Sequence, residues 1–135
     1  MNRFADLLNF VVSTLQTSSF CRSVRTIEAF RFSETQFGLK VRANLTSGHV
    51  LQVRLYRNGE HTDYAYQLFQ TDTPVLRWDN KEHFPSISSF PHHFHNASGL
   101  VEFSPLTGDP AHDLPFLLNW NVPEERERET LPPNL

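Results

Sequence analysis

The sequence predicts an α+β fold, in which an N-terminal helix packs on a mainly antiparallel sheet of four to six strands, with a histidine-rich loop and a short C-terminal helix. Three observations support this class. An apolar stripe at helical spacing opens the chain, alternating apolar and polar segments follow, and a segment rich in proline and histidine comes after residue 79. The 135 residues have room for one core. We expect one domain over 1–122, followed by an acidic, mobile tail over 123–135.

The first predicted element is a helix over residues 2–17. Its apolar side chains recur every three or four residues, as in a helix that buries one stripe: Phe4, Leu7, Leu8, Val11, Val12 and Leu15. A cluster of Thr and Ser at 17–19 ends it. Residues 24–32 have the aromatic and β-branched content of a strand, although neither of its faces is cleanly apolar.

The clearest strands lie on either side of Ser47-Gly48, a dipeptide suited to a tight turn. Apolar residues occupy alternate positions in 39–45 and again in 51–55, which predicts a hairpin with one buried face. Because side chains alternate strictly, the polar residues between them share the opposite face. We expect this face to bind phosphates through Lys40, Arg42, Arg54 and Tyr56.

Further strands follow over 63–70, after the turn at Asn58-Gly59, and over 75–79, after the turn at 71–74. Short turns between successive strands predict an antiparallel meander. Residues 80–99 contain two prolines and four histidines and predict a loop that crosses the sheet.

The last predicted elements are a short strand and a helix. Val101 and Phe103 favour the strand, and Asp109-Pro110 is typical of a helix start. Pro115 is compatible with a helix only in its first turn. Four apolar residues of this helix are expected to close the core: Leu114, Phe116, Leu117 and Trp120.

Charge is distributed unevenly around a net value of −3. Residues 20–57 contain seven Arg and Lys against two Glu, whereas the chain from Glu102 onward contains seven acids against two Arg. One interpretation is that both regions are ordinary solvated surfaces. The other is that their opposite charges attract, so that the acidic tail partly covers the basic face. The single cysteine cannot form an internal disulfide, and no apolar run reaches the roughly 18 residues of a membrane span. We therefore expect a cytoplasmic location and no membrane contact.

The histidine-rich segment is the candidate for chemistry, and three interpretations stay open. Its imidazoles can brace the loop, bind a metal, or act as general acid and base near neutral pH. In the acid–base hypothesis the catalytic residues are His92, His93, His95, Arg77, Asp79 and Tyr66. Substrate contacts then come from Lys40, Arg42, Arg54, Tyr56, Tyr64 and His83. Alternatively, the two tyrosines belong to the core edge, and Asp79 pairs with Arg77 or a loop histidine while Trp78 packs inward.

Several polar motifs in fixed order resemble the TumE-type toxin family. They are Asp63-Tyr64-Ala65-Tyr66, Arg77-Trp78-Asp79-Asn80, His83, and Phe90-Pro91-His92-His93-Phe94-His95, and the similarity extends from the Ser47-Gly48 hairpin to about Leu118. One departure concerns Lys81-Glu82-His83-Phe84, because relatives have a pair of histidines here and this chain has one. If the missing imidazole is catalytic in the family, its absence implies an inactive protein.

The resemblance implies a toxin of a toxin–antitoxin pair and hence an antitoxin as partner. We expect it to act on RNA as a metal-independent ribonuclease, with no cofactor and with a homodimer as one possible assembly. The alternative is a non-enzymatic module that binds RNA or protein and whose histidines are structural.

Overall fold

The computed structural model describes residues 3–130, and the side chains of residues 3–120. Two helices enclose a run of seven strands along the described chain. The helices are α1 (Phe4–Thr17) and α2 (Pro110–Thr130). The strands are β1 (Cys21–Arg31), β2 (Gln36–Leu45), β3 (His49–Asn58), β4 (His61–Gln70), β5 (Thr73–Asp79), β6 (His93–His95) and β7 (Val101–Glu102). The predicted α+β class and N-terminal helix are confirmed.

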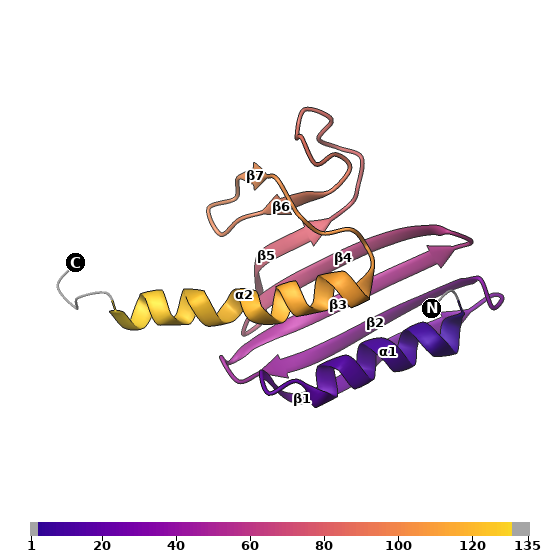
Figure 1. The fold of residues 1–135 in the computed structure, drawn as a ribbon, viewed down its shortest axis with the longest axis horizontal. Helices are drawn as coiled ribbons and strands as arrows, with labels where there is room; N and C mark the ends of the chain where they lie inside the picture. The colour runs from indigo at the N-terminus through magenta and orange to yellow at the C-terminus, as the bar shows by residue number, and fades with distance from the viewer. Residues whose placement is uncertain (1–2, 131–135) are drawn as a thin grey trace.

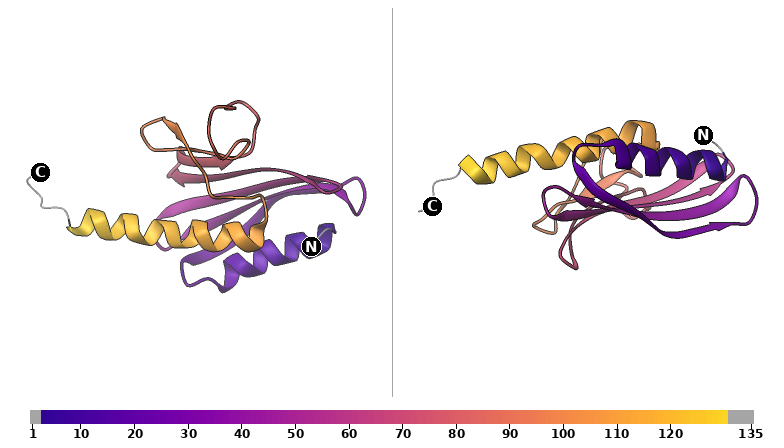
Figure 2. Two further views of the ribbon diagram at one scale, coloured as in Figure 1. Left: turned by 45° about the horizontal axis from the view of Figure 1, so that its top comes forward. Right: turned by 90° about the horizontal axis from the view of Figure 1, so that it is seen from below.

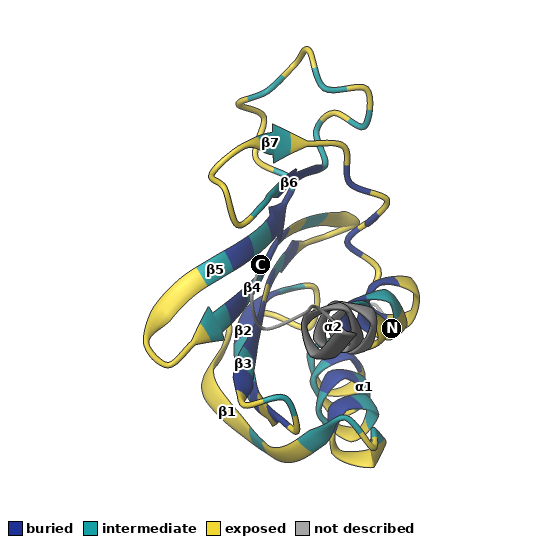
Figure 3. Ribbon diagram, turned by 90° about the vertical axis from the view of Figure 1, so that its left-hand side faces the viewer, coloured by how far each residue is buried: buried dark blue, intermediate teal, exposed yellow. Residues whose placement is uncertain are grey.

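All seven strands form one antiparallel sheet in the order of the sequence, β1 to β7 (Figure 1). Helices α1 and α2 lie next to each other on the same side of this sheet, as the two further views show (Figure 2). Seen edge-on, the other side carries no helix (Figure 3). We call this uncovered side the open face. The predicted meander is therefore confirmed, and it leaves one face of the sheet free for function.

The core lies between the helices and the sheet. Helix α1 buries Leu7, Val11 and Leu15, the centre of its predicted stripe. In the hairpin of β2 and β3 the alternate apolar residues are buried as expected: Leu39, Val41, Ala43, Leu45, Leu51, Val53 and Leu55. Gly48 has a φ of 91° in the connecting turn, a conformation that glycine adopts without steric cost.

The sheet has more strands than the four to six predicted, and the histidine-rich segment explains part of the difference. This segment does not cross the sheet as a loop. It extends the sheet at its edge, because β6 pairs with β5 and β7 pairs with β6. A strand of three residues has no periodicity of its own to detect, and its conformation is fixed by the ladder it joins.

The edge strand β1 begins at Cys21, three positions before the predicted start at residue 24, and pairs there with Leu45. Most of its side chains are exposed, and its pairing with β2 contains two register shifts. These shifts break the alternation that a sequence pattern relies on. Because β1 lies at the edge of the sheet, both of its faces carry a mixture of polar and apolar residues.

Helix α2 begins at Pro110, as predicted, and Asp109 caps it, because the amide of Ala111 donates to Asp109 Oδ1 at 3.0 Å. The helix continues past Pro115, which lies beyond the first turn, so the expectation that proline would be confined to that turn is wrong. Its backbone helix extends to Thr130 and includes part of the predicted tail. Residues 131–135 lie outside the described part, and the mobility of the tail stays a prediction.

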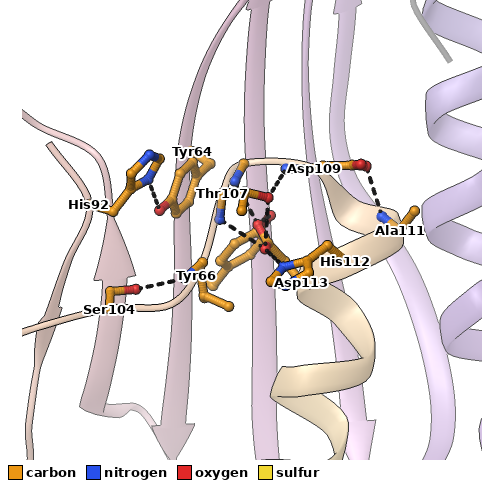
Figure 4. A network of polar contacts seen from close by, with 11 residues as sticks. Tyr64, Tyr66, His92, Ser104, Thr107, Asp109, Ala111, His112 and Asp113 are labelled. Carbon is orange, nitrogen blue, oxygen red and sulfur yellow. Dashed lines mark hydrogen bonds and ion pairs between the residues drawn. The ribbon is translucent and has the colours of Figure 1, made fainter. Parts of the chain in front are cut away.

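A buried carboxylate fixes α2 against the sheet. Asp113, fully buried, accepts hydrogen bonds from Tyr66 Oη at 2.8 Å, from the amide of Gly108 at 2.7 Å and from the amide of Thr107 at 3.0 Å (Figure 4). His112 Nδ1 lies 2.9 Å from the same carboxylate. The carboxylate thus joins β4, the loop before α2 and α2 itself.

Replacing this carboxylate should destabilise the fold. We expect Asp113→Asn to lower the free energy of unfolding by about 2–3 kcal/mol, because charge-assisted bonds to buried donors are lost. Urea denaturation followed by circular dichroism measures the change. Asp63→Asn is the matched control, since Asp63 is exposed and its ion pair is with exposed His61; it should change stability by less than about 0.5 kcal/mol. Equal stability of the two variants would contradict this role of Asp113.

Candidate functional site

The open face carries the predicted row of basic residues. Lys40 on β2 lies directly opposite Arg54 on β3, and Arg42 lies opposite Gln52. Tyr56 occupies the same face opposite Gly38. The shared face is confirmed, because the alternation of two paired strands fixes which side each residue takes. Arg54 is exposed and has no ion-pair partner within residues 3–120, so its charge is available.

Two of the three clustered histidines also reach this face. The pairing of β5 with β6 sets His95 opposite Arg77 and His93 opposite Asp79. Across β4, Arg77 pairs with Gln67 and Asp79 with Ala65, which in turn faces Arg54. The histidines and the arginines therefore share one side of one continuous sheet.

Asp79 is the centre of this arrangement and is 2% exposed. Its Oδ1 accepts from the amide of Lys81 at 2.9 Å and lies 3.0 Å from His93 Nε2. Its Oδ2 accepts from Arg77 Nε at 2.7 Å and lies 3.6 Å from His95 Nε2. We call Asp79, His93 and His95 the histidine cluster. One buried carboxylate orients an arginine and two imidazoles.

The two imidazoles differ in accessibility. His93 is 2% exposed, and its Nδ1 lies 3.1 Å from the carbonyl oxygen of Pro91. Both of its ring nitrogens thus face oxygen atoms of the protein. His95 is partly exposed, and its Nε2 faces Asp79. Of these two imidazoles, only that of His95 can contact a molecule in solution directly.

Burial lowers the pKa of His95 below its ordinary value, and the charges of His93 and Arg77 lower it further, while Asp79 acts in the opposite direction. Near neutral pH the His95 ring is therefore uncharged and can accept a proton. A neutral imidazole beside a cationic arginine is suited to general base chemistry on an anionic substrate.

A cavity of about 600 Å³ opens over the cluster and includes residues that sequence reasoning missed or assigned to substrate binding. His83, a predicted substrate contact, lines it together with Lys81 and Gln67. Phe84 also lines it and packs edge-on against His93 and His95, with ring centroids 4.8 and 5.8 Å apart. This phenylalanine occupies the position where the family resemblance leads us to expect a second histidine. It lies outside the helices and strands, so no pattern of alternating residues could have identified it as part of the site.

The remaining predicted residues lie on the helix-covered side. The side chain of His92 points to the opposite side of the sheet from that of His93, and its Nδ1 lies 2.7 Å from Tyr64 Oη (Figure 4). Tyr66 is fully buried and donates to Asp113. The structure therefore does not bring His92, Tyr64 or Tyr66 to the histidine cluster, and the interpretation of the tyrosines as core-edge residues is confirmed.

The Arg77-Trp78-Asp79-Asn80 run divides its residues between structure and site. Trp78 is buried and stacks on Phe94 with centroids 4.7 Å apart. Asn80 accepts from the amide of Tyr64 and donates to the carbonyl of Thr62, which joins the start of β4 to the end of β5. The expected inward packing of Trp78 and the pairing of Asp79 with Arg77 are confirmed.

The histidine cluster has the composition of a metal site, since its ligand atoms all lie within 4.8 Å of one another. The hydrogen bond of His93 Nδ1 to a carbonyl is also one that metal-binding histidines make. However, both oxygens of Asp79 already accept hydrogen bonds, one of them from a guanidinium. A cation would have to compete with the positive charge of Arg77, and the arrangement suits an anion better.

These features define an α+β protein with a basic open sheet face and, at its edge, a cluster of two histidines around a buried carboxylate. The family model described as "Toxin TumE" matches residues 11–125, and the chain belongs to this toxin family. It is thus the toxin component of a toxin–antitoxin system, and the family implies an antitoxin partner in general. No curated protein and no solved structure matches the chain. Neither helix in the described part has the length and apolar character needed to cross a membrane.

The charges around His95 give a signed prediction for its titration. We expect Arg77→Gln to raise the pKa of His95 and Asp79→Asn to lower it, because the first removes a neighbouring cation and the second a neighbouring anion. Titration followed by nuclear magnetic resonance of the imidazole carbons measures both shifts. Shifts in the same direction for the two variants would contradict the described contacts.

Proposed function

We propose that this toxin acts on RNA as a metal-independent ribonuclease in the cytoplasm. The observation that carries the proposal is the meeting of His95, with its lowered pKa, and Arg77 in one cavity on the basic open face. Metal-independent cleavage of RNA requires a base for the ribose hydroxyl, an acid for the leaving oxygen and a cation for the phosphate. The cavity contains residue types suited to each of these roles.

Arg77 is the phosphate-binding residue of this proposal. Its Nε is held by Asp79, which fixes the guanidinium plane, while the side chain is partly exposed toward the cavity. A guanidinium that is already oriented loses little further entropy when it binds a phosphate. Lys81 lines the same cavity, and Arg54 continues the positive charge along the face beside Lys40, which pairs with Glu28 at 3.5 Å. Phosphates on either side of the reacting one would bind there.

His95 is the proposed general base. Its Nε2 faces Asp79, so Nδ1 is the nitrogen that receives the proton of the ribose 2′-hydroxyl. The 2′-oxygen then bonds to phosphorus, the bond from phosphorus to the 5′-oxygen breaks, and that oxygen takes a proton from His83, which lines the same cavity. The products are a 2′,3′-cyclic phosphate and a free 5′-hydroxyl. His93 is a positioning residue, because it is buried and acts through Asp79.

Loss of the base should abolish activity. We expect His95→Ala to lower the rate of RNA cleavage about 10²- to 10⁴-fold and to relieve growth inhibition on expression. Cleavage of a labelled single-stranded RNA of mixed sequence measures the rate. His92→Ala is the matched control, because His92 is a neighbouring imidazole on the helix-covered side.

Three outcomes would contradict parts of this mechanism. A folded His95→Ala protein that stays fully toxic would eliminate histidine catalysis. Activity that is lost to a chelator and restored by a divalent ion would favour the metal-dependent alternative at the histidine cluster. Cleavage of an RNA whose 2′-hydroxyls are methylated would exclude attack by the 2′-oxygen.

The basic face should bind RNA even where cleavage is blocked. We expect Arg54→Ala to weaken binding to a 2′-O-methylated RNA and to reduce the slope of log affinity against log salt by about one unit. Fluorescence anisotropy at several salt concentrations measures both. Arg3→Ala is the control, since Arg3 is exposed at the start of α1. Identical binding by the two variants would remove the basic face from the proposal and favour a protein-binding module. A homodimer stays a prediction.

A further inference from the structure

A second cavity adjoins the first on the open face and is built differently. It has a volume of about 370 Å³ and shares Arg77 and Lys81 with the cavity over the histidine cluster. Its other walls include two aromatic rings, those of Phe30 and Tyr56, beside the cationic side chains of Lys40 and Arg54. Two carboxylates also line it, those of Asp63 and of Glu28, which pairs with Lys40 at 3.5 Å, so its four cations outnumber its two anions. Aromatic faces beside cations are the combination that single-stranded nucleic acid recognises, since bases stack on rings and phosphates bind the cations.

The two rings form a defined surface. Phe30 on the edge strand β1 pairs with Gly38, and Gly38 pairs with Tyr56 on β3. The ring centroids of Phe30 and Tyr56 are 6.3 Å apart with an angle of 36° between the planes. Tyr56 is held in place because its hydroxyl accepts from Gln36 Nε2 at 3.0 Å. We call Phe30, Gly38 and Tyr56 the aromatic site.

Gly38 is what allows this arrangement. The ring of Phe30 lies directly over its Cα, so that a Cβ at this position would come within 2.3 Å of Phe30 Cζ. Any other residue would push the ring away from the sheet. In this position Phe30 keeps 43% of its surface exposed, although a large apolar side chain is normally more buried. The exposed ring, the glycine beneath it and the neighbouring cations together point to a ligand with a flat face and a negative charge.

The distance between the aromatic site and the histidine cluster sets the length of a ligand that reaches both. Tyr56 is three strands and two to four residues away from the histidine cluster along the register. With about 4.8 Å between strands and about 3.4 Å per residue, this corresponds to roughly 15–20 Å. A ligand that reaches both must be a chain of several units, and Lys40, Arg54 and Arg77 lie along the way.

We propose that the aromatic site binds a base of single-stranded RNA, a few nucleotides from the phosphate held at the histidine cluster. This inference rests on the proposed function and adds to it the class of substrate. Stacking on Phe30 requires a base that is unpaired and free to leave its neighbours, so the site favours single strands over duplexes. Because every base has a flat face, the preference concerns strandedness more than sequence.

The test compares binding of oligonucleotides of about ten residues by fluorescence anisotropy, with 2′-O-methylated RNA so that cleavage does not interfere. We expect Phe30→Ala to weaken binding of the single strand at least about fivefold. Gly38→Ala should weaken it similarly, although it removes neither a ring nor a charge. Phe103→Ala is the control, because Phe103 is an exposed phenylalanine outside both cavities, and it should bind like the unmodified protein. Thermal unfolding confirms that each variant is folded.

An oligonucleotide that lacks bases separates stacking from charge. On this oligonucleotide Phe30→Ala and the unmodified protein should bind equally, while Arg54→Ala should still weaken binding. If the unmodified protein binds no RNA, the proposed function and this inference both fall. If it binds RNA but Phe30→Ala binds equally well, or loses affinity equally with and without bases, only this inference is overturned. Loss of antitoxin binding with RNA binding intact would likewise overturn it and assign the site to the protein partner.

Discussion

The pairing of β5 with β6 is the constraint on which the candidate site depends. This pairing sets His93 and His95 opposite Asp79 and Arg77 on the open face. A shift of one residue would turn His92 and Phe94 toward that face and would bury the other two imidazoles among apolar side chains. The stacking of Phe94 on Trp78, on the helix-covered side, opposes such a shift because it would expose both rings. The apolar side of the same three-residue strand therefore determines which histidines reach the substrate.

Two buried carboxylates organise the two sides of the sheet. Asp113 is surrounded by donors from the protein itself and makes a structural junction between α2 and β4. Asp79 is equally inaccessible, but the groups that it orients, Arg77 and His95, reach solvent. The Asp113 carboxylate holds parts of the fold together through its hydrogen bonds, whereas the Asp79 carboxylate orients side chains that a ligand can contact. This difference separates a structural network from a candidate active site.

Much of the fold could be predicted from the sequence, because the hairpin of β2 and β3 alternates strictly and ends in turn residues. The same alternation placed Lys40 and Arg54 on one face, and the structure has them directly opposite each other. The choice among the three histidines could not be made in this way, since alternation separates His92 from its neighbours but does not say which set faces outward. Phe30 and Phe84 carried no signal either. One lies on a strand with register shifts and the other lies between β5 and β6, so only the folded chain shows what each ring contacts.

The order of strands in this sheet has a consequence for how the protein is made. Every strand pairs with its neighbour in sequence, so the sheet can grow from the N-terminus by local contacts as the chain is synthesised. The basic strands are complete by residue 79, whereas the imidazoles of the histidine cluster arrive only with residues 93–95. A ribosome that has not yet reached residue 93 has therefore produced a surface for polyanions without the proposed general base, His95. On this proposal, cleavage of RNA begins only after residues 93–95 have joined the sheet.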